Sequence, residues 1–139
     1  MKHLILFSTL LGLAACRPNA DVTPVPLPGE VAGTYQTNGF LDYRCLALPA
    51  NQMPMVTLRA TSLNTLTVTL TRFRPKANEQ TLTGVTLSPQ PDQRIALMQG
   101  NQVIGSVQTS RVFTASGMET QGKLLRLSAM NTDFTGYLP

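Results

Sequence analysis

Alternation of apolar and polar side chains with a period of two runs through this chain from about residue 31 onward. Its clearest stretch is residues 66–71, in which leucine, valine and leucine alternate with three threonines. Successive side chains of a strand point to opposite faces, so this stretch presents one wholly aliphatic face. No window of helical length carries an apolar stripe at the spacing of a helix. The pattern therefore predicts an all-β domain built from half-buried strands.

Further short strands are expected between clusters of glycine, asparagine and proline. Their predicted ranges are 31–37, 41–48, 55–61, 80–88, 93–99, 102–109, 111–115, 123–130 and 132–138. Gly100 and Asn101 separate two of these ranges and suit a tight hairpin turn. At Gly84, and between Leu70 and Phe73, the apolar residues no longer fall at every second position. These interruptions of the alternation predict bulges or bends. Short strands with short links predict an antiparallel meander that closes into a small barrel, because closure removes exposed edges; a β-sandwich is the alternative.

The amino-terminal residues have a different composition from the rest. Residues 1–15 carry the basic Lys2 near their start, continue through an apolar run of about ten residues and end in small residues, which is the layout of a secretory signal peptide. The apolar run is shorter than the roughly 20 residues of a membrane-spanning helix. Residues 13–16, Leu-Ala-Ala-Cys, resemble the lipobox of bacterial lipoproteins.

The lipobox resemblance implies that Cys16 becomes the lipid-modified first residue of the mature protein and anchors it to a membrane of the cell envelope. Arg17, rather than aspartate, follows that cysteine, which by similarity to proteobacterial sorting implies the outer membrane, facing the periplasm. Residues 16–30 are rich in proline and are expected to form an extended tether, so the folded domain is predicted at 31–139. The alternative is an ordinary signal peptide cut at another small residue.

Two short patterns at the ends of the predicted domain are similar to those of small lipocalin-like lipoproteins. Residues 33–35, Gly-Thr-Tyr, correspond to the Gly-x-Trp of their first strand, with tyrosine replacing tryptophan, and residues 134–136, Phe-Thr-Gly, to an aromatic-x-Gly pattern in their last strand. The resemblance implies a barrel, which can hold one small apolar ligand. The inward-facing candidates for contact with a ligand are Tyr35, Tyr43, Leu70, Leu97, Val107 and Leu127. Aliphatic side chains are also numerous enough to fill the barrel, so a filled core is the alternative.

A second resemblance is to periplasmic lysozyme-inhibitor lipoproteins, which carry a Tyr-x-Cys strand and a Ser-Gly loop. Residues 43–45, Tyr-Arg-Cys, and the pair Ser116 and Gly117 correspond to these motifs. The resemblance implies that Ser116 and Gly117 form a loop that enters a partner. The cysteine of that family is usually disulfide-bonded, whereas Cys16 is the only other cysteine here and is expected, from the lipobox resemblance, to carry lipid. Alternation predicts instead that Cys45 is a buried apolar thiol.

Histidine occurs once, at His3, within the predicted signal peptide. The mature chain then has no imidazole for acid–base catalysis or metal binding, so no enzymatic activity, metal or cofactor is expected. Ten basic and seven acidic side chains remain, a net charge of about +3 without a basic stripe, which argues against nucleic-acid binding. The densest basic stretch, residues 72–76, is interpreted as a solvated strand end, with contact to anionic lipid or glycan as the alternative.

These observations together predict a lipid-anchored envelope protein that acts as a non-enzymatic binding or structural module. Its expected ligand is a small apolar molecule or an envelope protein. Inhibition of a lysozyme-like enzyme is the alternative.

Overall fold

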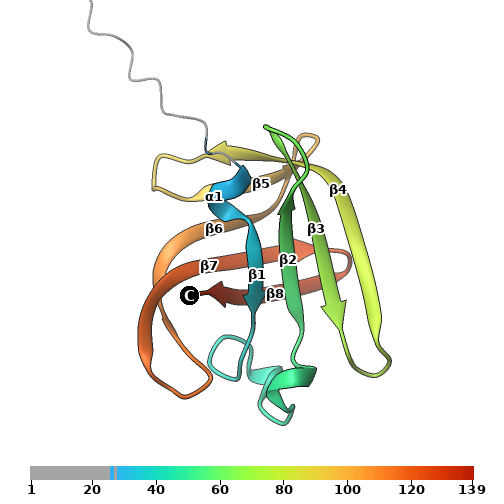
Figure 1. The fold of residues 1–139 in the computed structure, drawn as a ribbon, viewed down its shortest axis with the longest axis vertical. Coiled ribbons are helices and arrows are strands. Elements are labelled where there is room, and N and C mark those ends of the chain that lie inside the picture. The colour runs from blue at the N-terminus through green and yellow to red at the C-terminus, as the bar shows by residue number, and fades with distance from the viewer. Residues whose placement is uncertain (1–25, 27) are drawn as a thin grey trace, which may run out of the picture.

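Eight strands hold most of the residues that the computed structural model describes, which are residue 26 and residues 28–139 (Figure 1). One short helix, α1 (Pro28–Val31), precedes them. The strands are β1 (Gly33–Gln36), β2 (Met55–Ala60), β3 (Thr65–Arg72), β4 (Asn78–Pro89), β5 (Ile95–Gln99), β6 (Gln102–Phe113), β7 (Glu119–Ala129) and β8 (Thr132–Leu138). Among the described residues, no helix has the length and apolar character that a membrane crossing needs.

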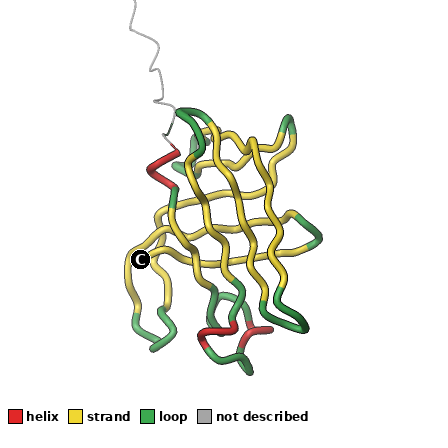
Figure 2. The backbone as a smooth tube through the Cα atoms, turned by 45° about the vertical axis from the view of Figure 1, so that its right-hand side comes forward, coloured by secondary structure: helices red, strands yellow, loops and turns green. Residues whose placement is uncertain are grey.

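The strands form a closed antiparallel barrel in which each strand pairs with the next along the chain and β1 pairs with β8. Gln36 of β1 lies opposite Tyr137 of β8 at the closing seam. Figures 1 and 2 show β1, β2 and β3 running side by side along the barrel, while β6, β7 and β8 run across them. The predicted meander barrel is therefore confirmed, and the sandwich is not formed.

The core of the barrel consists of the aliphatic faces that the alternation predicted. On β3, Leu66, Val68 and Leu70 are fully buried, whereas the threonines between them are partly exposed. The same buried cluster includes Val31, Tyr35, Val56, Leu58, Val85, Leu97, Ile104, Val107, Leu125, Leu127 and Phe134. Side chains from all eight strands thus meet inside the barrel and fill it.

The pairing of the strands tests the two irregularities predicted at Gly84 and between Leu70 and Phe73. The register between β3 and β4 shifts between Leu66 and Val68, where two β4 residues lie opposite the single β3 residue Thr67. One of the two is Gly84, whose φ of +72° is one that glycine adopts readily. The predicted bulge at Gly84 is confirmed. The interruption between Leu70 and Phe73 arises because β3 ends at Arg72, so Phe73 lies beyond the strand. Gln99 pairs with Gln102, so the predicted two-residue hairpin between β5 and β6 is also confirmed.

The strand predicted at 41–48 is wrong. Residues Tyr43–Cys45 form a single-turn 3-10 helix, followed by a second at Ala50–Gln52. The Asp42 side chain accepts a hydrogen bond from the backbone N–H of Arg44, which stabilises the turn in place of an extended backbone. Tyr43 is consequently 78% exposed and does not face the barrel interior. The ranges 102–109 and 111–115, predicted as two strands, are one continuous strand, β6.

The two patterns that resemble lipocalin-like lipoproteins lie on the strands that close the barrel. Tyr35 of β1 is fully buried, and its hydroxyl donates a hydrogen bond of 2.8 Å to the carbonyl oxygen of Val31. On β8, the Phe134 ring packs where Gly136 has no side chain, since a Cβ there would lie 2.4 Å from the ring. Tyr35 and Phe134 thus belong to the same core near the closing seam.

Burial of Tyr35 makes stability depend on pH in the alkaline range. Desolvation raises the pKa of its phenol from 10.0 to about 12. The unfolded chain releases this proton near pH 10, so the stabilisation is complete below pH 10 and falls by roughly 2 kcal/mol as the pH rises to about 12. We expect Tyr35→Phe to lack this fall, as measured by urea unfolding of both proteins between about pH 9 and 12. Parallel curves for the two proteins would contradict the assignment.

All contacts that close and fill the barrel come from residues 31–138. A chain of residues 26–139 therefore retains the whole described core and every described strand pair. This shorter chain is suitable for experiments in solution.

Candidate functional site

The long connection between β1 and β2, residues 37–54, is attached to β6 by Asn38. The Asn38 side chain is 2% exposed. Its Oδ1 accepts hydrogen bonds from the backbone N–H groups of Phe40 (2.9 Å) and Leu41 (3.2 Å). Its Nδ2 donates to the carbonyl oxygen of Phe113 at 2.8 Å. One amide therefore shapes the turn after β1 and fixes it beside the end of β6.

Five large apolar side chains are exposed on this connection and the adjoining β6–β7 hairpin, and we name them the distal apolar surface. They are Phe40 (62% exposed), Tyr43 (78%), Leu46 (72%), Phe113 (47%) and Met118 (66%). The ring centroids of Phe40 and Phe113 are 5.7 Å apart. Elsewhere in the described part of the chain, the exposed large apolar residues are Leu63 and Val103. Figure 1 shows both loops at the end of the barrel away from α1.

Ser116 and Gly117 lie in the turn of the β6–β7 hairpin, which borders the distal apolar surface. Both residues are exposed. The Ser116 hydroxyl lies 2.8 Å from that of Thr114, and Gly117 lies beneath the Phe40 ring.

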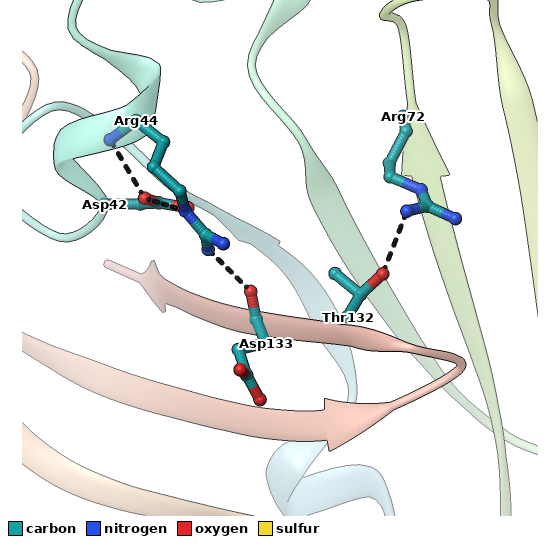
Figure 3. Close-up of polar contacts among 5 residues, drawn as sticks. All are labelled: Asp42, Arg44, Arg72, Thr132 and Asp133. Carbon is teal, nitrogen blue, oxygen red and sulfur yellow. Dashed lines mark hydrogen bonds and ion pairs between the residues drawn. The ribbon is translucent and has the colours of Figure 1, made fainter.

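A cavity of about 700 Å³ opens at the same end of the barrel, and we name it the mouth cavity. It lies between the β1–β2 connection, the end of β3 and the β7–β8 hairpin. Its lining consists of Asp42, Arg44, Cys45, Leu48, Pro54, Arg72 and residues 128–134. Figure 3 shows Arg44 and Arg72 approaching the β7–β8 hairpin from two different elements.

Asp42 and Arg44 form a forked ion pair on one side of the mouth cavity. Arg44 Nε and Nη2 donate to the two carboxylate oxygens of Asp42, each at 2.8 Å. The hydrogen bond from Arg44 lowers the pKa of the Asp42 carboxyl, which stays ionised at neutral pH. Arg44 Nη2 also donates to the carbonyl oxygen of Asp133 at 3.0 Å (Figure 3). The Arg44 charge is therefore compensated, and its side chain covers the edge of β8.

Arg72 contributes a guanidinium group from the last residue of β3. Arg72 lies on the same face of β3 as Leu66, Val68 and Leu70. Its side chain therefore projects from the inner face of the strand, at the barrel opening. Arg72 Nη1 donates to the Thr132 hydroxyl at 2.9 Å, and Nη2 to Gln80 Oε1 at 3.0 Å (Figure 3). Both acceptors are neutral, and no carboxylate of the described residues forms an ion pair with Arg72.

Cys45 lies in the wall of the mouth cavity as a free, buried thiol. Its burial confirms the prediction, although the turn rather than a strand places it. Burial raises the pKa of the thiol, so the sulfur remains protonated at neutral pH and is a weak nucleophile.

The predicted ligand residues divide into three groups. Tyr35, Leu70, Leu97 and Val107 are packed in the core. Leu127 is in the core and also lines a second cavity, of about 520 Å³, whose wall is formed by residues of β5, β6, β7 and β8 and of the β4–β5 link. Tyr43 is on the distal apolar surface, where the prediction did not place it. Cys16 lies outside the described residues.

Sequence reasoning missed the role of Arg72, which it assigned to a solvated strand end. The alternation along β3 could have revealed this role. Arg72 lies two residues after Leu70 and therefore on the same, inward-facing side of the strand. Arg74 and Lys76 are exposed, as that interpretation expected. The distal apolar surface had no comparable sequence pattern, since its members come from two loops far apart in the chain.

Within residue 26 and residues 28–139, no three histidine, cysteine, aspartate or glutamate side chains are grouped so that they could hold a metal ion. No family model matches the chain, and no curated protein or solved structure is significantly similar to it.

Proposed function

We propose that this protein is a lipid-anchored, non-enzymatic binding module of the bacterial cell envelope, which holds a partner protein against its distal apolar surface. The observation that carries the proposal is the concentration of exposed apolar side chains. Five of the seven exposed large apolar residues in the described part of the chain lie on two adjoining loops. Aromatic residues and methionine gathered on a surface are typical of protein interfaces.

The described chain enters the barrel at the end opposite the proposed binding surface (Figure 1). Lipid on Cys16 is expected from the lipobox, and the residues that follow are rich in proline. The described chain begins beside α1, and the distal apolar surface lies at the other end of the barrel (Figure 1). A tether entering at one end directs the other end away from the anchoring membrane, which we propose to be the outer membrane, toward partners in the periplasm.

The packing of the core favours a binding site on the surface rather than a ligand held inside the barrel. Tyr35, Leu70 and Leu97 are fully buried among other core side chains. A ligand in the interior would have to displace them, at a cost of lost packing. Binding at the end of the barrel needs no such displacement.

The sequence supports a non-enzymatic role. The chain has one histidine, within the predicted signal peptide. The Cys45 thiol is buried and protonated, so it is unsuited to nucleophilic catalysis.

Photo-crosslinking from the distal apolar surface tests the proposal. We expect a benzophenone amino acid in place of Phe40 or Met118 to give one discrete adduct with an envelope protein in intact cells. The same amino acid at Leu63, which is 81% exposed on the β2–β3 hairpin, is the matched control and should not give that adduct. Adding Phe113→Ser to the Phe40 probe should abolish it, because that ring supports Phe40.

Three results would contradict the proposal. They are the absence of an adduct from both surface positions, the same adducts from Leu63, and an adduct whose mass equals two copies of this chain.

Inhibition of a lysozyme-like enzyme is a second candidate, because Ser116 and Gly117 are exposed beside the distal apolar surface. An inhibitor of this kind would insert the hairpin turn into an enzyme cleft. Titration of lysozyme with residues 26–139 tests it, and undiminished lysozyme activity at excess protein would remove this candidate.

A further inference from the structure

We propose that the mouth cavity binds an organic carboxylate carried on an apolar body, with the carboxylate received by the guanidinium of Arg72. The site is separate from the distal apolar surface and goes beyond the function proposed above. Three features of the cavity carry this inference: the hydrogen bonding of Arg72, the arrangement of the neighbouring carboxylates, and the apolar wall.

Arg72 has hydrogen-bonding capacity that the described protein groups do not use. A guanidinium carries five N–H donors in a planar fork. The structure assigns one bond to the Thr132 hydroxyl and one to Gln80 Oε1, both neutral acceptors. A carboxylate makes shorter, charge-assisted bonds with such a fork and neutralises it. Arg72 is thus held in place by neutral groups while its charge stays available to a ligand.

The two carboxylates in the cavity wall are already engaged and do not compete for Arg72. The Asp42 carboxylate is held by the fork of Arg44. The Asp133 carboxylate accepts a hydrogen bond of 2.7 Å from the Ser128 hydroxyl. Figure 3 shows that this carboxylate points away from both guanidinium groups. The uncompensated charge facing the cavity is therefore that of Arg72.

Most of the remaining lining residues are apolar and match the body of such a ligand, whereas Ser128, Asn131 and Thr132 are polar. Leu48 and Pro54 line the cavity from the β1–β2 connection, and Ala129, Met130 and Phe134 from the β7–β8 hairpin. Met130 is partly buried and packs against the core cluster. A volume of about 700 Å³ falls in the range of roughly 300–1,000 Å³ that is usual for small-molecule sites.

Methionine methyl resonances provide a direct test, since Met130 lies in the cavity and Met118 on the distal apolar surface. A chain of residues 26–139 labelled with carbon-13 at the methionine methyls is titrated with decanoate below its micelle concentration. A second titration uses an N-acetylated apolar tripeptide with a free carboxyl terminus. We expect a saturable shift of the Met130 resonance with at least one probe, and none for Met118.

Matched neutral probes and variants isolate the contribution of the carboxylate. Decanol and the tripeptide amide should bind at least about tenfold more weakly than their acids, and Arg72→Gln should weaken acid binding by about 10- to 100-fold. Arg74→Gln is the control, because Arg74 is exposed and bonds to Gln52 instead. If Arg72→Gln does not fold, Arg72→Lys retains the charge without the fork and should still weaken binding.

Each result of these titrations either supports or overturns the proposed carboxylate site. Saturation by decanoate assigns a fatty-chain carboxylate, and saturation by the peptide acid assigns a peptide carboxyl terminus; either result supports the site. Equal affinity for acid and neutral probes, equal loss in Arg74→Gln, or no shift of Met130 with either acid would overturn it. None of these results bears on the crosslinking of the distal apolar surface.

Discussion

Replacing Leu97 with alanine is expected to lower the free energy of unfolding by about 2–5 kcal/mol, because it removes a fully buried side chain from a filled core. Leu97 of β5 lies opposite Leu87 of β4 and Gly105 of β6, so its side chain packs among strands on both sides. The change leaves a cavity that the closed barrel cannot readily collapse. Urea unfolding followed by circular dichroism measures the loss.

The same substitution distinguishes a filled barrel from a hollow one. Leu63→Ala is the matched control, because Leu63 is 81% exposed and its truncation should change stability by less than about 0.5 kcal/mol. If Leu97 bordered a ligand chamber, truncation would enlarge that chamber at little cost. A loss of less than about 1 kcal/mol for Leu97→Ala would therefore contradict the filled core and favour an internal ligand.

If Cys16 carries the proposed lipid, replacing it with serine is expected to abolish lipid attachment and to remove the protein from the outer-membrane fraction in which we propose that it resides. Burial of acyl chains contributes about 0.8 kcal/mol per methylene, so the several chains of a bacterial lipoprotein make the anchor effectively permanent. A serine hydroxyl cannot replace the thiol that the proposed lipid modification requires. Incorporation of radiolabelled palmitate, and mass spectrometry of the mature amino terminus, measure the change.

Cys45→Ser is the control for this prediction. Cys45 is the other cysteine of the chain and is buried in the fold. Its replacement should leave palmitate incorporation and membrane location unchanged. Palmitate retained in Cys16→Ser, or lost in Cys45→Ser, would contradict the assignment of the anchor to Cys16.

The strands were predicted well where one face of the chain meets the core. Residues 66–71 fall within β3 because aliphatic side chains at every second position can all be buried only in an extended backbone. The error at 41–48 arose where alternation was accidental. There, the side chains of Asn38 and Asp42 bond to nearby backbone N–H groups, and this local competition overrides the apparent strand pattern.

Cys45 shows that a correct outcome can have a different cause from the one expected. Alternation predicted its burial on a strand, together with Tyr43. The structure buries Cys45 in a turn and exposes Tyr43 on the distal apolar surface. A 3-10 turn does not alternate faces as a strand does, so neighbouring residues no longer share the predicted environment.

By itself, the sequence determined that the domain is all-β, where most strands run, and which aliphatic side chains form the core, because alternation directly reflects the two faces of a strand. The lipid anchor on Cys16 is a prediction of the sequence alone, since that residue lies outside the described structure. Only the tertiary structure decided that Phe40 meets Phe113 and that Arg72 reaches Thr132 across the barrel opening. Periodicity reports the face on which a side chain lies, whereas its partners depend on how distant loops and strands meet when the barrel closes.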